Sequence, residues 1–205
     1  MKKAMYTAST ALIEALQEGG VSYIFANLGS DHPGFIEAVA CARAEGRSIP
    51  AIITCPNEMV GMSCAQGYAQ VTGQAQAVVV HVECGTQALA GAVHNAAKGR
   101  VPMFIFAGLS PFTQEGEMLG SRNEFIQWIQ DVYDQRGIVR EYMKYNNELR
   151  TPLNVKPIVH RALQFAHSEP RGPVYLVGAR EVMEAEGRPA ETEIARWRPV
   201  APMAS

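Results

Sequence analysis

The sequence lacks the features that would place a protein on a membrane or on a nucleic acid. Its 205 residues contain no apolar run long enough to cross a bilayer, and the net charge of −2 gives no excess of basic residues. Two lysines lie near the N-terminus, but Glu14, Gln17 and Glu18 then interrupt the apolar pattern, which predicts a first helix rather than a signal peptide. These absences favour a cytoplasmic protein with neither a membrane nor a nucleic-acid partner.

Cysteine is also scarce, and its spacing excludes the common redox and zinc motifs. The four cysteines are Cys41, Cys55, Cys64 and Cys84, and no two of them form a CxxC pair. All four fall in stretches that we expect to form core elements. We interpret them as reduced, buried thiols of a cytosolic protein rather than as disulfides or metal ligands.

Apolar runs of strand length alternate with longer helical stretches along most of the chain. Continuous β-branched residues favour parallel strands that are covered on both faces. The runs fall at 21–28, 49–54, 75–82, 101–108 and 172–178, with a weaker candidate at 137–145. Helices are expected near 7–18, 33–45, 57–72, 86–98, 122–135 and 155–167. The alternation predicts an α/β fold with a doubly wound, mainly parallel six-stranded sheet and helices on both faces.

We predict one domain over residues 1–186. Residues 187–205 are rich in Pro, Arg and Glu without sustained periodicity, which is typical of a linker or arm. In a doubly wound sheet, ligands bind beyond the carboxyl ends of the strands. The loops expected to carry function are therefore 27–34, 54–58, 83–87 and 108–122.

A single acid, Glu58, opens the helix expected at 57–72 and is followed by apolar and small residues. One interpretation is a first-turn acid that faces the helix dipole on a surface, which contributes well under ~1 kcal/mol. However, the turn after Glu58 offers almost no polar company, so we expect its carboxyl to be partly removed from water. A carboxyl in that environment can exchange a proton with a nitrogen heterocycle.

Four segments, taken in order and spacing, resemble one family of domains. They are GVSYIFANLGSDHPGFIEAV, NEMVGMSCAQGYAQVTG, RVPMFIFAG and RGPVYLVG. They are similar to the N-terminal pyrimidine-binding (Pyr) domain of thiamine diphosphate-dependent enzymes, and look closest to the acetolactate synthase-like group. The resemblance covers about residues 4–183, with Gln70 where the family typically has arginine.

The resemblance implies a role for Glu58. The matching glutamate of the family hydrogen-bonds the N1′ nitrogen of the cofactor's aminopyrimidine ring and favours its imino tautomer. The exocyclic nitrogen of that tautomer removes the proton from thiazolium C2, which then attacks a 2-keto acid. The resemblance therefore implies thiamine diphosphate as the cofactor, Glu58 as the catalytic acid, and a transferase or lyase activity.

The resemblance also implies further contacts with cofactor and substrate. Gly29 matches a glycine of the loop that lies over the reactive carbon of the cofactor in the partner subunit. Gly85 and Thr86 match a turn that approaches the cofactor. Asp31 and His32 follow Gly29 and are candidates for substrate contact.

Other polar residues give weaker indications. Gln127 stands where several relatives have histidine, and Lys144 matches a basic residue of the family, so both are candidates for the substrate side. The alternative for Lys144 is a solvated lysine at a strand end. Ala88 stands where asparagine is common. We interpret His81 and His94 as structural, with His94 on the inner side of its helix.

The chain contains no GDG sequence. In the family that motif belongs to a separate domain, which holds Mg²⁺ and the diphosphate. We therefore expect this chain to supply half of an active site, which a diphosphate-binding domain or subunit completes in a homodimer or higher homo-oligomer. Residues 187–205 favour a fragment that leads to a central domain.

Two alternatives stay open. The chain also fits the alpha subunit of a split decarboxylase of the sulfopyruvate or phosphonopyruvate type. A non-catalytic dimerising or regulatory module is favoured by Ala88 and Gln127 and opposed by Glu58, because such a module has no need of that acid.

Overall fold

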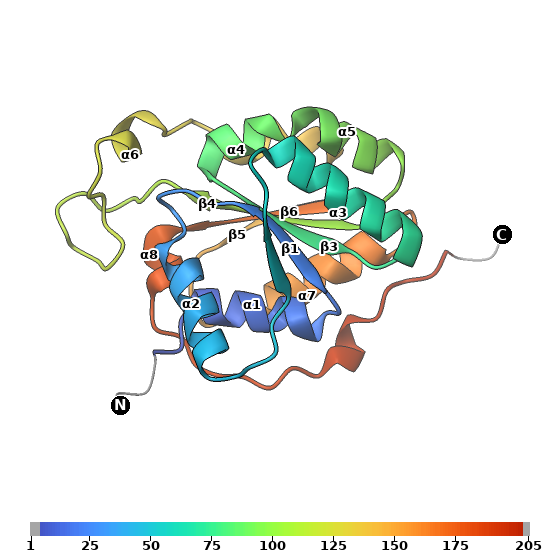
Figure 1. Ribbon diagram of the computed structural model, residues 1–205, viewed down its shortest axis with the longest axis horizontal. Helices are drawn as coiled ribbons and strands as arrows, with labels where there is room; N and C mark the ends of the chain where they lie inside the picture. Colours follow the sequence, from blue (N-terminus) through green and yellow to red (C-terminus); the bar gives the residue numbers. More distant parts are fainter. Residues whose placement is uncertain (1–4, 203–205) are drawn as a thin grey trace.

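Six parallel strands form one sheet in the computed structural model, which describes residues 5–202 apart from the side chain of Ala90 (Figure 1). The strand order is β2-β1-β3-β4-β6-β5, and all neighbours pair in parallel. The strands are β1 (Tyr23–Asn27), β2 (Ala51–Thr54), β3 (Gln76–Val80), β4 (Met103–Leu109), β5 (Tyr145–Leu149) and β6 (Pro173–Ala179).

Helices cover both faces of this sheet (Figure 1). One face carries α1 (Ala8–Glu18), α2 (Pro33–Ala44), α7 (Val155–His167) and α8 (Arg180–Glu184). The other face carries α3 (Glu58–Thr72), α4 (Val82–Ala88) and α5 (Ala90–Lys98). The predicted doubly wound α/β fold is confirmed.

The sheet is buried on both sides because its central strands β3, β4 and β6 are apolar at nearly every position. Along β4, Phe104 and Phe106 pack in the core under α1 and α7, whereas Met103 and Ile105 pack in the core under α3 and α5. Successive side chains of a strand point to opposite faces, so one continuous apolar run supplies both cores.

The weak strand expected at 137–145 was misplaced. Residues Gln135–Ile138 and Arg140–Tyr142 form two 3₁₀ turns, η1 and η2, and the strand is β5, which begins at Tyr145. β5 carries Asn146, Asn147 and a glutamate, and it lies at the edge of the sheet with β6 as its neighbour. An edge strand tolerates polar residues, so its sequence carries little apolar signal.

Two expected helices also differ from the structure. The stretch 122–135 contains a single helical turn, α6 (Ile126–Ile129). The stretch 86–98 contains the end of one helix and the whole of another. The first is α4, which already starts at Val82 directly after β3, and the second is α5. The short α8 had no counterpart among the predicted helices.

The order of the strands sets the position of a ligand site. The chain passes from β1 to β2 on one side and then crosses back to β3 on the other side. At such a switch point the connections leave in opposite directions, and a crevice opens beyond the carboxyl ends of the two strands. A ligand crevice is therefore expected where β1 and β3 end, beside the start of α3.

Residues 187–202 run along α7 and include a 3₁₀ turn, η3 (Ile194–Trp197) (Figure 1). Trp197 stacks on His160, and the Arg198 carbonyl accepts a hydrogen bond from Gln164. The boundary at residue 186 and the linker role of the segment stay predictions. Within the described part of the chain, no helix combines the length and apolar character needed to cross a membrane.

Candidate active site

Glu58 lies at the switch point, where α3 begins. The cap of α3 is the side chain of Asn57, which accepts hydrogen bonds from the backbone N–H groups of Met59 and Val60. The Glu58 carboxylate turns instead toward the sheet, where its Oε1 accepts a hydrogen bond from Asn27 Nδ2 at 3.0 Å. Glu58 is half-buried. Helix capping therefore does not account for this acid, whose polar end faces the carboxyl end of β1.

Small residues leave room around this carboxylate. A Cβ atom on Gly85 would lie 3.3 Å from Glu58 Oε1 and 3.0 Å from the Cβ of Val80. A larger residue at position 85 would thus press against the acid. The neighbouring Thr86 is fully buried, and its hydroxyl donates to the Val82 carbonyl and lies 2.7 Å from Tyr175 Oη. The Thr86 hydroxyl is engaged inside the protein, and its predicted cofactor contact stays a prediction.

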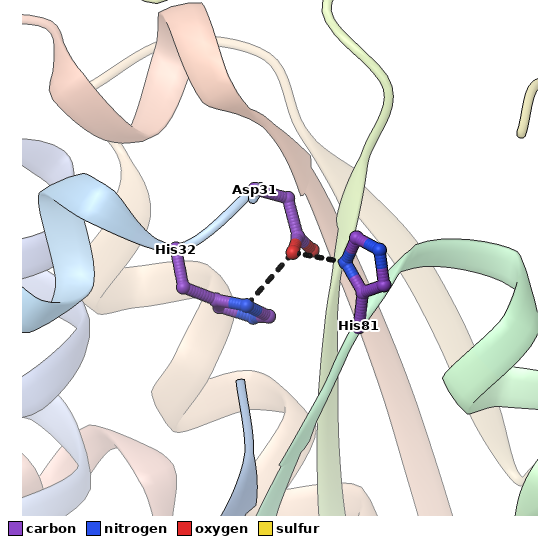
Figure 2. Close-up of side chains that lie close together, drawn as sticks. All are labelled: Asp31, His32 and His81. Carbon is purple, nitrogen blue, oxygen red and sulfur yellow. Dashed lines mark hydrogen bonds and ion pairs between the residues drawn. The ribbon is translucent and has the colours of Figure 1, made fainter. Parts of the chain in front are cut away.

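Asp31, His32 and His81 form one cluster in the segments that follow β1 and β3 (Figure 2). Asp31 Oδ1 lies 2.5 Å from His81 Nδ1 and 2.8 Å from His32 Nδ1. Asp31 Oδ2 accepts a hydrogen bond from the Val82 backbone N–H at 3.2 Å. Asp31 and His32 are buried, whereas His81 is half-buried at the end of β3. His81 is therefore the member that opens toward solvent.

The cluster favours an ionised Asp31 and a basic His81. Burial alone would raise the pKa of Asp31, but the charge and hydrogen bonds of His32 and His81 outweigh it and lower that pKa well below its usual range. The hydrogen bond to Asp31 raises the pKa of His81, against the opposing effect of partial burial. A carboxylate that binds Nδ1–H also fixes the imidazole tautomer and leaves Nε2 for other partners.

The distances in this cluster are those of hydrogen bonds. One carboxylate and two imidazoles have the composition of a transition-metal site. Nitrogen and oxygen ligands around a tetrahedral zinc, each about 2.0–2.1 Å from the metal, lie about 3.3 Å from each other. The 2.5 Å and 2.8 Å separations are shorter, which fits shared protons better than a shared cation.

The backbone around the cluster is tightly fitted. Val82 has φ of 27°, a left-handed conformation that is rare for a β-branched residue and costs of order 1–3 kcal/mol. A Cβ atom on Gly29 would lie 2.2 Å from the His81 ring. The missing side chain of Gly29 therefore leaves room for the His81 ring. The predicted position of Gly29 over the cofactor stays a prediction.

Gly108, at the end of β4, gives the space that Asp31 occupies. A Cβ atom on Gly108 would lie 1.9 Å from Asp31 Oδ2. We predict that Gly108→Ala lowers the free energy of unfolding by about 1–3 kcal/mol, because an overpacked buried site must displace Asp31. Urea unfolding of the purified chain measures this change.

The matched control is Gly67→Ala on the exposed face of α3. A Cβ atom at Gly67 meets no atom within 4 Å, so alanine there is expected to stabilise the helix by about 0.5–1 kcal/mol. Equal effects of the two alanines would contradict the placement of Asp31 against Gly108.

Gln127 and Lys144 make their hydrogen bonds with other parts of the protein than Glu58 and the Asp31 cluster. Gln127 is fully buried, and its Oε1 accepts hydrogen bonds from the backbone of Asn123 and Glu124. Lys144 precedes β5, at the amino edge of the sheet, and its Nζ donates to the carbonyls that end α7. The suggested substrate-side roles of both residues stay predictions.

Asp31 and His32 lie behind His81, which is the partly exposed member of the cluster. Both are buried, and the polar contacts of Asp31 go to His32, His81 and the Val82 backbone. Direct substrate contact by either residue stays a prediction. His94 is exposed, so its expected position on the inner side of its helix was wrong.

The cysteines are less buried than expected. All four are free, and Cys55 is buried, but Cys64 and Cys84 are exposed on α3 and α4 and Cys41 is intermediate. The prediction of four buried thiols was therefore wrong, because apolar and small residues of these helices also line outer faces.

Buried polar atoms without a hydrogen-bond partner gather at the carboxyl edge of the sheet. Within the described residues they belong to segments that follow β1, β4 and β6: Ser30, His32, Ser110, Gln130 and Glu181. Ser110 and Gln130 also line a cavity of about 250 Å³. Orphaned buried polar groups are rare and need an explanation, such as a bound molecule.

A larger cavity lies in the other layer of the molecule. It has a volume of about 570 Å³ and is lined by Glu14 of α1, Glu37 of α2 and Arg47 of the segment after α2, among others. It contains neither Glu58 nor His81. Size alone would favour this cavity as the site, but the orphaned groups and the proton-sharing cluster lie at the carboxyl edge.

Two residues of this site could not be singled out from the sequence. Asn27, which binds Glu58, and His81, interpreted as structural, both stand where a strand ends beside the switch point. Their positions at the carboxyl ends of β1 and β3 were the available signal. Their partners were not readable, because they lie 31 and 50 positions away in the chain.

The chain is similar in sequence to parts of two larger proteins. It is 36% identical over 99 residues to the protein named "Putative acetolactate synthase large subunit IlvX" of Mycobacterium tuberculosis, which covers 48% of this chain and 18% of that protein. It is 28% identical over 172 residues to benzoylformate decarboxylase of Pseudomonas aeruginosa, which covers 84% of this chain and 30% of that protein.

A solved structure shares the fold. Thiamine diphosphate-dependent 4-hydroxybenzoylformate decarboxylase of Rhodococcus jostii RHA1 superposes with a TM-score of 0.72 at 24% identity, over 93% of this chain and 33% of that one. The chain thus spans a third or less of the length of these relatives. The family described as "Thiamine pyrophosphate enzyme, N-terminal TPP binding domain" matches residues 6–138, more than half of the chain. The chain therefore belongs to the thiamine pyrophosphate enzyme family, as an N-terminal TPP-binding domain.

Proposed function

We propose that this chain supplies the pyrimidine-binding half of a thiamine diphosphate-dependent site that acts on a 2-keto acid. The activity is that of an acetolactate synthase-like carboligase or decarboxylase. The observation that carries the proposal is the half-buried Glu58 carboxylate, which Asn27 holds at the switch point of the sheet. Glu58 hydrogen-bonds the N1′ nitrogen of the aminopyrimidine ring and shares a proton with it.

The residues present fit the aminopyrimidine end of the cofactor. A carboxylate partly removed from water suits a ring nitrogen that gains and loses a proton. Gly85 leaves the space beside Glu58 free of side chain, and orphaned polar atoms lie at the same edge of the sheet. Thiamine diphosphate, when bound, supplies the carbon nucleophile that adds to the keto group.

In the proposed site, His81 is a second proton-transfer group besides Glu58. Its Nδ1 is hydrogen-bonded to the buried carboxylate of Asp31. Its partly exposed ring lies at the end of β3, and the neighbouring strand β1 ends at Asn27. A histidine held in this way is oriented by its partner, and the hydrogen bond to Asp31 raises its pKa. In this role His81 Nε2 gives or accepts a proton at the substrate side.

The other half of the site belongs to a diphosphate-binding domain or subunit, which also holds Mg²⁺. The outer face of α3 and the edge strand β2 support a paired assembly, because they expose apolar side chains. Met59 and Val60 are 48% and 50% exposed, Val71 is 88% exposed, and Ile53 of β2 is 40% exposed. Apolar patches of this kind mark protein interfaces. A homodimer or higher homo-oligomer would cover them.

Titration of the isolated chain with thiamine diphosphate and Mg²⁺ tests the half-site. We predict weak or no heat of binding in calorimetry, because the chain lacks the groups that hold the diphosphate. Adding a diphosphate-binding domain from a relative is expected to restore binding. Tight binding by the chain alone would contradict the half-site, and an absence of binding by the complemented pair would contradict the cofactor assignment.

A further inference from the structure

The cavity of about 250 Å³ at the carboxyl edge of the sheet has polar groups in its wall that the protein itself leaves unpaired. The hydroxyl of Ser110 and both polar atoms of the Gln130 side chain are buried, and they have no hydrogen-bond partner among the described residues. Gln130 is only 6% exposed. A buried polar atom without a partner destabilises the folded state. Two such side chains on one cavity indicate a place for a polar ligand, and we call this space the Gln130 cavity.

The wall of the Gln130 cavity is held firmly against β4. Gln135 of η1 lines the cavity. Its Nε2 donates hydrogen bonds to the Gly108 carbonyl at 2.8 Å and to Tyr175 Oη at 3.0 Å, and both bonds are buried. The amide nitrogen of Gln135 is therefore occupied, and these bonds fix η1, to which Arg136 belongs, at the end of the sheet.

The charged groups around the Gln130 cavity leave one positive charge without a partner. Three acids line it, and each forms an ion pair with an arginine outside it: Asp131 with Arg122, Asp134 with Arg140, and Glu148 with Arg150. Arg136 also lines the cavity, is half-buried, and forms no ion pair within residues 5–202. Three carboxylates and four guanidinium groups thus leave an excess of one positive charge.

The Gln130 cavity adjoins the Asp31 cluster but does not include its histidines. Gln130 favours the protonated form of His81, so the two side chains lie near each other, although Gln130 makes no hydrogen bond with that ring. Neither His81 nor Glu58 lines the cavity. A molecule bound there would lie beside the cluster.

We propose that the Gln130 cavity binds the carboxylate of a small polar organic acid, with Arg136 as the charged partner and Gln130 and Ser110 as hydrogen-bond donors. A guanidinium group presents N–H donors in a planar fork that matches a carboxylate. One excess positive charge suits a single carboxylate better than a phosphate, which carries more negative charge at pH 7.5. The volume lies below the range of about 300–1,000 Å³ in which drug-sized ligands bind, so a smaller molecule is expected. The proposal needs neither the cofactor nor Glu58.

NMR titration of the ¹⁵N-labelled chain with sodium acetate and sodium pyruvate at pH 7.5 tests the proposal. Sodium chloride keeps the ionic strength constant. We expect saturable changes in the backbone N–H signal of Ser110 and the side-chain NH₂ signals of Gln130, with Kd in the millimolar range. Inorganic phosphate is expected to bind more weakly than pyruvate. Methylammonium chloride, a small cation, is expected to cause no saturable change.

Two variants separate the contributions of charge and amide. Arg136→Gln is expected to raise the Kd for pyruvate by about 10-fold or more, because a hydrogen-bonded charge is lost. The control is Arg43→Gln, which removes the same charge from the exposed face of α2 and should keep the wild-type Kd. Gln130→Leu is expected to weaken binding while raising the midpoint of urea unfolding, because it removes two buried atoms that have no partner.

The proposal would be overturned by changes that do not saturate, or by equal Kd values for pyruvate in wild type and folded Arg136→Gln. An equal loss in Arg136→Gln and Arg43→Gln would also overturn it, by showing an effect of net charge alone. Tighter binding of phosphate or of methylammonium would contradict the choice of a carboxylate. If Gln130→Leu does not fold, the two arginine variants decide. No thiamine diphosphate is present in these titrations, so the outcome is separate from that of the cofactor proposal.

Discussion

Replacing Glu58 with glutamine is expected to slow turnover of a 2-keto acid by about 10²- to 10⁴-fold, the range that a positioned proton-transfer group contributes. Glutamine keeps the size of the side chain and can still bind Asn27, but it cannot share a proton with a ring nitrogen. The measurement is kcat of the chain assembled with its diphosphate-binding domain, with pyruvate and benzoylformate as probes. Thiamine diphosphate affinity is expected to change much less than kcat.

The control for this substitution is Glu37→Gln. Glu37 is an exposed acid of α2, and its carboxylate contacts the thiol of Cys41. Its substitution is expected to leave kcat near the wild-type value. Wild-type turnover by folded Glu58→Gln would rule out Glu58 as the acid at the pyrimidine ring, and would favour the non-catalytic module.

The Asp31→Asn variant is expected to lose about 3 kcal/mol of the free energy of unfolding at pH 6. The amide keeps the shape of the side chain but removes the charge that accepts hydrogen bonds from His81 and the Val82 N–H and that lies 2.8 Å from His32 Nδ1. Hydrogen bonds to a buried charged group contribute about 1.5–3 kcal/mol each, and part of that is kept by the amide oxygen. Urea unfolding followed by circular dichroism measures the difference.

The size of this loss is expected to depend on pH. The folded-state pKa of Asp31 is lowered, so its contribution is present above about pH 4 and is lost as the pH falls through the folded value. The folded-state pKa of His81 is raised, so its contribution is complete below about pH 6.5 and is lost as the pH rises through the folded value. The difference between wild type and Asp31→Asn should therefore be largest between about pH 4 and 6.5.

Asp131→Asn provides the matched control. Asp131 forms an ion pair with Arg122, but its side chain is 49% exposed. Exposed ion pairs typically contribute about 0–1 kcal/mol. If Asp31→Asn costs no more than Asp131→Asn, or if its cost does not vary with pH, then Asp31 does not hold the two imidazoles as described.

The strongly apolar parts of the fold could be predicted from the sequence. The runs that became β3, β4 and β6 are buried along nearly their whole length, so their composition alone indicates parallel strands. Glu58 could be singled out because the residues after it offer no polar partner. Segment 122–145 could not be predicted, because its short turns and its polar edge strand β5 depend on tertiary contacts.

The chemistry around Glu58 was less accessible to sequence reasoning. The hydrogen bond from Asn27 joins the end of β1 to the start of α3, and the bond between Asp31 and His81 joins the segments that follow β1 and β3. These segments meet because β1 lies between β2 and β3 in the sheet. The sequence names the residue types in each loop, but it does not say which side chain turns inward. Gly108 illustrates this limit, because its small size has meaning only beside Asp31.

The central claim is that Glu58 activates the cofactor through the pyrimidine nitrogen. Its most direct test is the rate at which the thiazolium C2 proton of bound thiamine diphosphate exchanges with deuterium, measured by quenched-flow NMR on the chain assembled with its diphosphate-binding domain. We predict that Glu58→Gln slows this exchange by about 10²-fold or more while the cofactor stays bound. An unchanged exchange rate in the cofactor-loaded variant would contradict the claim.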